Sequence, residues 1–170
     1  MRILAFVLTF LTLLTACVPT NSTPPAPIPT TQTLATELQS LGVAQRFIPF
    51  LSKEASQAGV RHFRPLPLIL NAGRAADKPR LYGLTKRNRV VYLDGATDAG
   101  RSPFIILHEI SHAAHYGGAC GGHHSTWATD FAGRAERFQA QFPNMRWLGQ
   151  PPTNMARELA RQYGVGGKCP

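Results

Sequence analysis

One segment decides how this 170-residue chain is interpreted: Ser102-Pro103-Phe104-Ile105-Ile106-Leu107-His108-Glu109-Ile110-Ser111-His112-Ala113-Ala114-His115. Ser102 before Pro103 is typical of a helix start, because serine caps free backbone N–H groups and proline fits the first helical position. No glycine or further proline interrupts 104–115, so the sequence predicts one helix there. His108 and His112 are four residues apart and therefore project from the same helical face.

This spacing is suited to binding a metal ion. Imidazole is a good ligand for Zn²⁺, which lowers the pKa of a bound water molecule to about 7. Glu109 lies one step round the helix from His108, where it can take a proton from that water instead of binding the metal. We therefore expect Zn²⁺ as the cofactor, His108 and His112 as ligands, and Glu109 as the catalytic general base.

A catalytic zinc site also needs a third protein ligand, with one coordination position left for water. The glycine-rich segment 116–122 should turn the chain back after the first helix, and a second amphipathic helix is predicted over 124–142. His115 lies a turn beyond His112, which suits an outer position better than a ligand. The other candidates are near the turn or on the second helix: His123, His124, Asp130 and Glu136.

With His108-Glu109-Ile110-Ser111-His112 followed by His123-His124-Ser125-Thr126-Trp127, the sequence resembles the SprT-like branch of the zincin metallopeptidases. That family has an H-E-x-x-H helix, a turn, and then H-G-x-x-F or H-G-x-x-W at the start of the next helix. The resemblance covers 102–131 and implies that His123 is the third ligand. Because His124 replaces the glycine of the family pattern, His124 stays open as the alternative metal ligand.

The expected fold class is α+β and zincin-like. A small antiparallel sheet or hairpin, formed by 80–84 and 89–93, should pack on the active-site helix and on the ligand-bearing helix that follows. The strand at 89–93 should also offer an edge to which an extended peptide could add. Further helices are predicted over 34–41, 49–58 and 154–163, each followed by a glycine.

The first residues predict export. Met1-Arg2 precedes an apolar run that is too short to span a bilayer, so residues 1–16 are expected to be a signal peptide. Its end, Leu14-Thr15-Ala16-Cys17, resembles the lipobox of bacterial lipoproteins, which implies lipidation of Cys17. Residues 17–33 then form a tether rich in proline and threonine, and residues 34–170 form the zinc metallopeptidase-like domain. The expected location is the cell envelope, on a bacterial membrane.

Two other cysteines remain if Cys17 carries lipid. Cys120 and Cys169 form an even pair in an exported protein and are therefore a disulfide candidate. Two free thiols or two metal ligands are the alternatives, since the sequence fixes neither their distance nor their redox state.

The net charge of +9 indicates attraction to anionic surfaces, such as lipid headgroups or envelope polymers. We expect no nucleic-acid partner, because the basic residues are scattered and no recognisable nucleic-acid module accompanies them. The densest basic cluster, Lys86-Arg87-Asn88-Arg89, is interpreted as a solvated turn.

The residues together predict a lipid-anchored zinc metallopeptidase that hydrolyses a peptide or protein substrate. Two alternatives are a non-catalytic envelope lipoprotein with a structural zinc or a partner-binding role, and a zinc amidase that acts on cell-wall peptides. Oxyanion stabilisation would need a further group. Nothing in the sequence selects among the candidates: Tyr116, His124, Arg134 and Tyr163.

Overall fold

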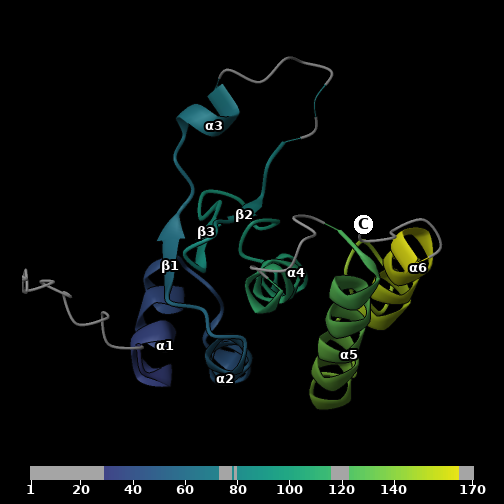
Figure 1. The fold of residues 1–170 in the computed structure, drawn as a ribbon. Coiled ribbons are helices and arrows are strands. Elements are labelled where there is room, and N and C mark those ends of the chain that lie inside the picture. Colours follow the sequence, from purple (N-terminus) through teal and green to yellow (C-terminus); the bar gives the residue numbers. More distant parts are fainter. Residues whose placement is uncertain (1–28, 73–77, 79, 116–122, 165–170) are drawn as a thin grey trace, which may run out of the picture.

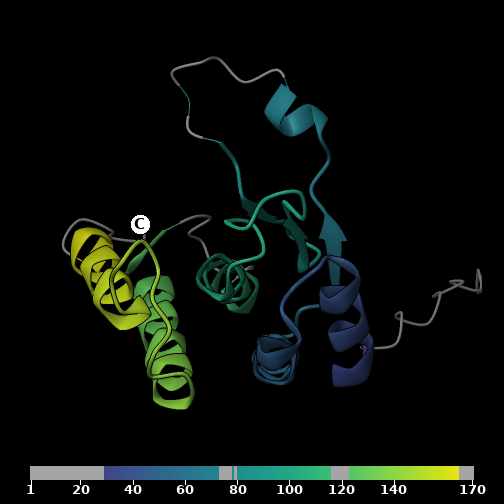
Figure 2. The same cartoon turned by 180° about the vertical axis from the view of Figure 1, so that it is seen from behind.

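The computed structural model describes residues 29–72, 78, 80–115 and 123–164. Within them it forms a mixed α+β fold, which confirms the expected class. Figures 1 and 2 show the sheet at the centre, with α4 between the α1–α2 pair and the α5–α6 pair. The elements in chain order are α1 (Thr31–Ser40), the 3₁₀ helix η1 (Gln45–Phe47), α2 (Ile48–Gln57), β1 (His62–Pro65), α3 (Ile69–Ala72), β2 (Gly83–Thr85), β3 (Val90–Leu93), α4 (Pro103–Ala114), α5 (Ser125–Gln141) and α6 (Pro152–Gly164).

The three strands have the order β1-β3-β2, with β1 parallel and β2 antiparallel to β3. The two expected strands pair antiparallel, and β1 is an additional strand that the sequence did not predict. The chain runs along β1, returns along β2 and reverses again in the hairpin, so β3 runs in the direction of β1 and lies between the other two strands.

The β2–β3 hairpin is confirmed, with Gly83 opposite Leu93 and Thr85 opposite Val91. In the turn, Arg89 N–H donates to Lys86 O at 2.8 Å. The expectation that 89–93 offers a free edge is wrong, because β3 is the central strand and has a neighbour on each side. Of the two hairpin strands, β2 is the one at the edge of the sheet.

The helix starts follow the capping signals in the sequence. At α4, Ser102 Oγ accepts a hydrogen bond from the Phe104 N–H at 3.2 Å, and Pro103 occupies the first turn. At α1, Thr30 Oγ1 accepts from the Thr33 N–H at 3.2 Å. The first helix therefore begins at Thr31, three residues before the expected start of the domain.

The hydrophobic core lies between the sheet and the helices, and α4 passes through its centre. Four apolar residues of α4 are buried in it: Ile106, Leu107, Ile110 and Ala113. Fully burying one such large side chain contributes about 1.5–3 kcal/mol, so this helix is held firmly. All members of this core lie between Leu34 and Ala156, so a chain without its first 17 residues keeps every one of them.

Several expectations fall on residues that the structure does not describe: the signal peptide at 1–16, Cys17, Cys120 and Cys169. In the described part of the chain, no helix combines the length and apolar character needed to span a bilayer.

Candidate metal centre

Three histidines converge at the C-terminal half of α4. His108 Nε2 lies 3.2 Å from His112 Nε2 and 3.1 Å from His123 Nε2. Two nitrogens bound to one tetrahedral zinc ion at 2.0–2.1 Å would be about 3.3 Å apart. The donor atoms of all three residues lie within 4.8 Å of one another, so the cluster has the dimensions of a metal site.

The environment keeps these imidazoles neutral, as metal ligands must be. Burial, and then the nearby His112 and His123, hold the pKa of His108 well below its usual value. Burial likewise lowers the pKa of His112 to about 3, and it lowers the pKa of His123. Their nitrogen lone pairs are therefore available to an ion at neutral pH.

Trp127 of α5 fixes the orientation of the three rings. Its ring stacks on His112 with a centroid distance of 4.9 Å and an interplanar angle of 19°. It also lies 4.3 Å from the His123 centroid and meets the His108 ring edge to face at 4.8 Å. Its Nε1–H donates to the carbonyl of His108 at 3.4 Å. The ligand-bearing segments of the chain are thus packed on one buried indole.

Glu109 lies beside the cluster in a buried position. Thr85 of the edge strand places its Oγ1 2.7 Å from Glu109 Oε2 and 2.9 Å from the Glu109 carbonyl oxygen. Burial raises the pKa of Glu109 to about 7, while the Thr85 hydrogen bond acts in the opposite direction. The carboxyl group is therefore poised to exchange a proton near neutral pH.

Gly83 makes room for this carboxyl group. A Cβ at position 83 would lie 2.6 Å from Glu109 Cγ and 2.8 Å from Oε1, closer than real side chains approach. The sequence pattern did not single out Gly83 or Thr85, although a glycine inside a strand often marks a close approach of another group. Thr85 lies one residue beyond the strand expected over 80–84.

A pocket of about 320 Å³ opens over the motif. The β2 side contributes its wall, and the three histidines and Glu109 form its floor. The pocket is lined by Leu81, Gly83, Leu84, Thr85, His108, Glu109, His112 and His123. At the far end, the Asn71 side chain holds Leu81 through two hydrogen bonds to its backbone, at 2.9 and 3.0 Å.

The structure does not bring His124 into the cluster. Its Nδ1 accepts a hydrogen bond from the Trp127 N–H at 3.3 Å, so it caps the first turn of α5. His115 is also outside, at the C-terminal end of α4, where its ring meets His124 edge to face at 5.7 Å. Of the two adjacent histidines, His123 is therefore the one that reaches the other ligands.

The acidic candidates are occupied elsewhere. Asp130 Oδ2 accepts a hydrogen bond from Arg134 Nε at 2.8 Å, and Glu136 pairs with Arg157 on the surface at 2.8 Å. Neither carboxylate belongs to the cluster of potential metal ligands found among the described residues.

Arg134, one candidate for oxyanion stabilisation, lies in a buried ion network. Its Nη1 donates to Glu54 Oε2 at 2.7 Å, and Arg137 donates to the same oxygen at 2.8 Å. This network joins α2 to α5. The charge of Arg134 is paired with Glu54 there, so it does not face the pocket. Tyr116 and the side chain of Tyr163 are outside the described part of the chain.

Comparisons with models of known protein families, with curated proteins and with solved structures find no match. The function proposed below therefore rests on the geometry of the described residues and on the sequence.

Proposed function

We propose that this protein is a lipid-anchored, zincin-like zinc metallopeptidase of the cell envelope. The observation that carries the proposal is the convergence of three imidazole nitrogens beside a buried carboxyl group. His108, His112 and His123 hold the ion, and Glu109 is the general base. The lipobox-like segment ending at Cys17 supports the anchor and the exported location.

A zinc ion in this site supplies a Lewis acid that activates water and polarises a peptide carbonyl. Glu109 takes the proton released by the attacking water and passes it to the leaving amine. A pKa of about 7 suits both steps, because the same group must accept and then return a proton at neutral pH. Thr85 holds the carboxyl group in place, and Trp127 holds the ligand rings.

A peptide substrate fits the edge strand beside the pocket. In the ladder to β3, Lys86 N–H donates to Val90 O, and Tyr82 O accepts from Asp94 N–H. Because these roles alternate along an antiparallel strand, Gly83 and Thr85 direct their backbone N–H and C=O groups to the outer side. No described strand pairs with that side. An extended peptide can therefore add there and pass over the histidine cluster.

The main rival function is a structural zinc site in a non-catalytic lipoprotein. A structural site is closed by four protein ligands, whereas the candidate cluster among the described residues has three donors and borders a pocket. A structural site also has no use for a buried carboxyl group beside the ligands. These two observations favour the hydrolase. An amidase of cell-wall peptides would use the same residues on another substrate.

The test compares wild type with Glu109→Gln, since the amide keeps the shape of the side chain but cannot accept a proton. Both proteins should hold one zinc ion per chain, measured by elemental analysis. Only wild type should cleave members of a broad peptide library, detected by mass spectrometry of the products. Cleavage by both proteins at equal rates would reject Glu109 as the base. Metal binding without cleavage by either would favour the structural site.

A further inference from the structure

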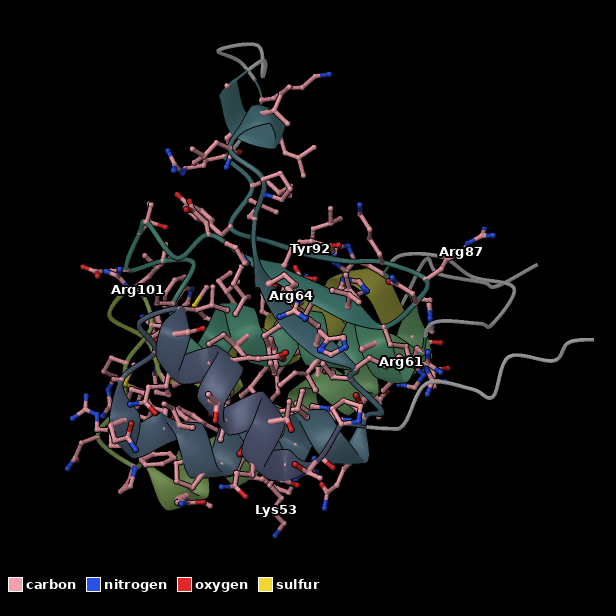
Figure 3. All side chains as sticks on the ribbon, turned by 90° about the vertical axis from the view of Figure 1, so that its left-hand side faces the viewer. Lys53, Arg61, Arg64, Arg87, Tyr92 and Arg101 are labelled. Atoms are coloured by element: carbon pink, nitrogen blue, oxygen red, sulfur yellow. The ribbon has the colours of Figure 1, made fainter. Side chains whose placement is uncertain are left out.

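We propose that Arg61, Lys86, Arg87 and Arg89, called here the basic edge, form the surface with which the domain rests on an anionic phospholipid bilayer. The proposal rests on the lipid anchor proposed above and assigns the orientation of the domain relative to the membrane. All four residues are exposed. Figure 3 shows Arg61 and Arg87 at the same, right-hand end of the view.

No carboxylate among the described residues forms an ion pair with the basic edge. Among the described residues, the carboxylates outside the pocket pair with other cations, such as Glu37 with Arg64 and Asp94 with Arg80. The positive field of the basic edge is therefore available to an external polyanion.

The backbone of Arg89 is in a conformation that favours glycine. Its φ angle is 59°, in the left-handed region, which costs a residue with a side chain roughly 1 kcal/mol or more. Two contacts hold the Arg89 backbone in this conformation. The Arg61 N–H donates to Arg89 O at 2.9 Å, and the guanidinium of Arg89 lies directly against Gly59. Glycine would adopt this backbone conformation at a lower cost in free energy. An arginine at this position therefore favours a function for its positive charge.

Lys86 of the basic edge faces away from the pocket, which favours a membrane over a bound peptide as its partner. Thr85 points toward Glu109, on the α4 side of the sheet. Because successive strand residues alternate between the two faces, Lys86 points to the opposite face. There its Nζ lies 5.0 Å from the centre of the Tyr92 ring.

The chain also enters the domain from this side. The C-terminal end of α1 lies near Arg101, since a Cβ at Gly42 would be 3.2 Å from Arg101 Cδ. Figure 3 shows Arg101 and the Arg61 side at opposite ends of the view. Thr31, at the start of this ten-residue helix, therefore lies about 15 Å away, toward the basic edge. The 13 residues from Val18 to Thr30 reach at most about 45 Å, so the proposed anchor leaves the basic edge within reach of the bilayer.

The test uses a chain that begins at Val18, which keeps the whole core and has no acyl group. Its binding is measured by co-sedimentation with vesicles of phosphatidylcholine, with and without phosphatidylglycerol. The triple variant Arg61→Gln, Lys86→Gln and Arg87→Gln is compared with Arg46→Gln, Lys53→Gln and Arg146→Gln. The control removes the same charge from exposed cations that form no ion pair with any described carboxylate.

We expect binding only to vesicles with phosphatidylglycerol, and a roughly 100-fold weaker partition coefficient for the basic-edge variant. The control variant should retain most of its binding. Arg89→Gly should also bind less while its melting temperature stays equal or rises, because the strain at this position is relieved. Such a result separates the loss of binding from any loss of folding.

Equal losses in the two triple variants would overturn the proposal, because net charge alone would then explain the binding. Absence of binding to anionic vesicles would also overturn it. Binding to polyglutamate through the same residues, without vesicle binding, would indicate an acidic protein partner instead. The assay needs neither zinc nor hydrolysis, so its outcome is independent of whether the proposed peptidase activity fails.

Discussion

Thr85 and Glu109 join the edge strand to α4, the helix that carries His108 and His112. Thr85 Oγ1 has one proton and two acceptors, the carboxylate of Glu109 at 2.7 Å and its carbonyl at 2.9 Å. The strand that would bind a substrate thus also positions the group that would act on it. A shift of β2 would move the carboxyl group relative to the histidines, so the pocket wall and its floor depend on each other.

Glu109→Gln should change how the stability of the metal-free protein depends on pH. Burial raises the pKa of Glu109 from 4.5 to about 7, so the folded state holds this proton more tightly than the unfolded chain does. That stabilisation is complete below pH 4.5 and is lost as the pH rises through 7. Glutamine stays neutral, so the free energy of unfolding of the variant should rise relative to wild type across this pH range, by about 3 kcal/mol at its upper end.

Thermal unfolding of both proteins in a chelator at several pH values measures the difference. A difference that does not vary with pH would show that Glu109 is not perturbed.

Gly83→Ala should displace the Glu109 carboxyl group. The new Cβ would lie 2.6 Å from Glu109 Cγ, and such crowding in a packed interior typically costs about 1–3 kcal/mol. Gly133→Ala is the control, because its Cβ would meet only Arg137 Nη1 at 3.6 Å and alanine favours the helix by about 0.5–1 kcal/mol. Urea unfolding should therefore move in opposite directions for the two variants. Equal effects would argue against the close approach at Gly83.

His123→Ala and His124→Ala should have different consequences. Loss of His123 removes a ligand and should abolish stoichiometric zinc binding. Loss of His124 removes the cap of α5, so it should lower stability by about 1 kcal/mol while zinc remains at one ion per chain. Elemental analysis and urea unfolding of both variants separate the two roles. Loss of zinc in His124→Ala but not in His123→Ala would show that His124, and not His123, is the third ligand.

Glu54→Ala should be much more damaging than Glu136→Ala. Glu54 is buried and accepts hydrogen bonds from Arg134 and Arg137, so its removal leaves the buried Arg134 with Asp130 as its remaining carboxylate and should cost about 3 kcal/mol. In the Glu136–Arg157 pair the side chains are 48% and 64% exposed, and such pairs contribute at most about 1 kcal/mol. Urea unfolding tests the contrast. Similar losses would mean that the buried network is not what holds α5 to α2.

The elements that the sequence predicts well are those with local signals. Ser102 and Pro103 mark the start of α4, and the polar turn before 89–93 marks the hairpin. β1 has no such signal: of its four residues only Phe63 is buried, and its partner β3 lies almost thirty residues away in the chain. Its parallel pairing depends on the whole path of the chain, which no local pattern encodes.

In the candidate site too, local sequence patterns predict some positions, whereas others depend on tertiary packing. Helical spacing is enough to place His108 and His112 together. The choice between His123 and His124 depends on the backbone at the start of α5, where the cap conformation of His124, with φ −141° and ψ 171°, goes with a side chain that bonds to the Trp127 N–H. Thr85 is brought to Glu109 by the packing of the sheet on α4, across 24 residues of sequence.

The three proposed metal ligands are close together in the chain as well as in space. His108, His112 and His123 span only 16 residues, so the unfolded chain closes this loop at a small entropic cost. Zinc would then also bind the unfolded chain, and only the difference between the two affinities stabilises the fold. Metal added in excess should therefore raise the melting temperature by less than the native affinity implies, and a newly made chain should be able to capture the ion before the sheet has formed.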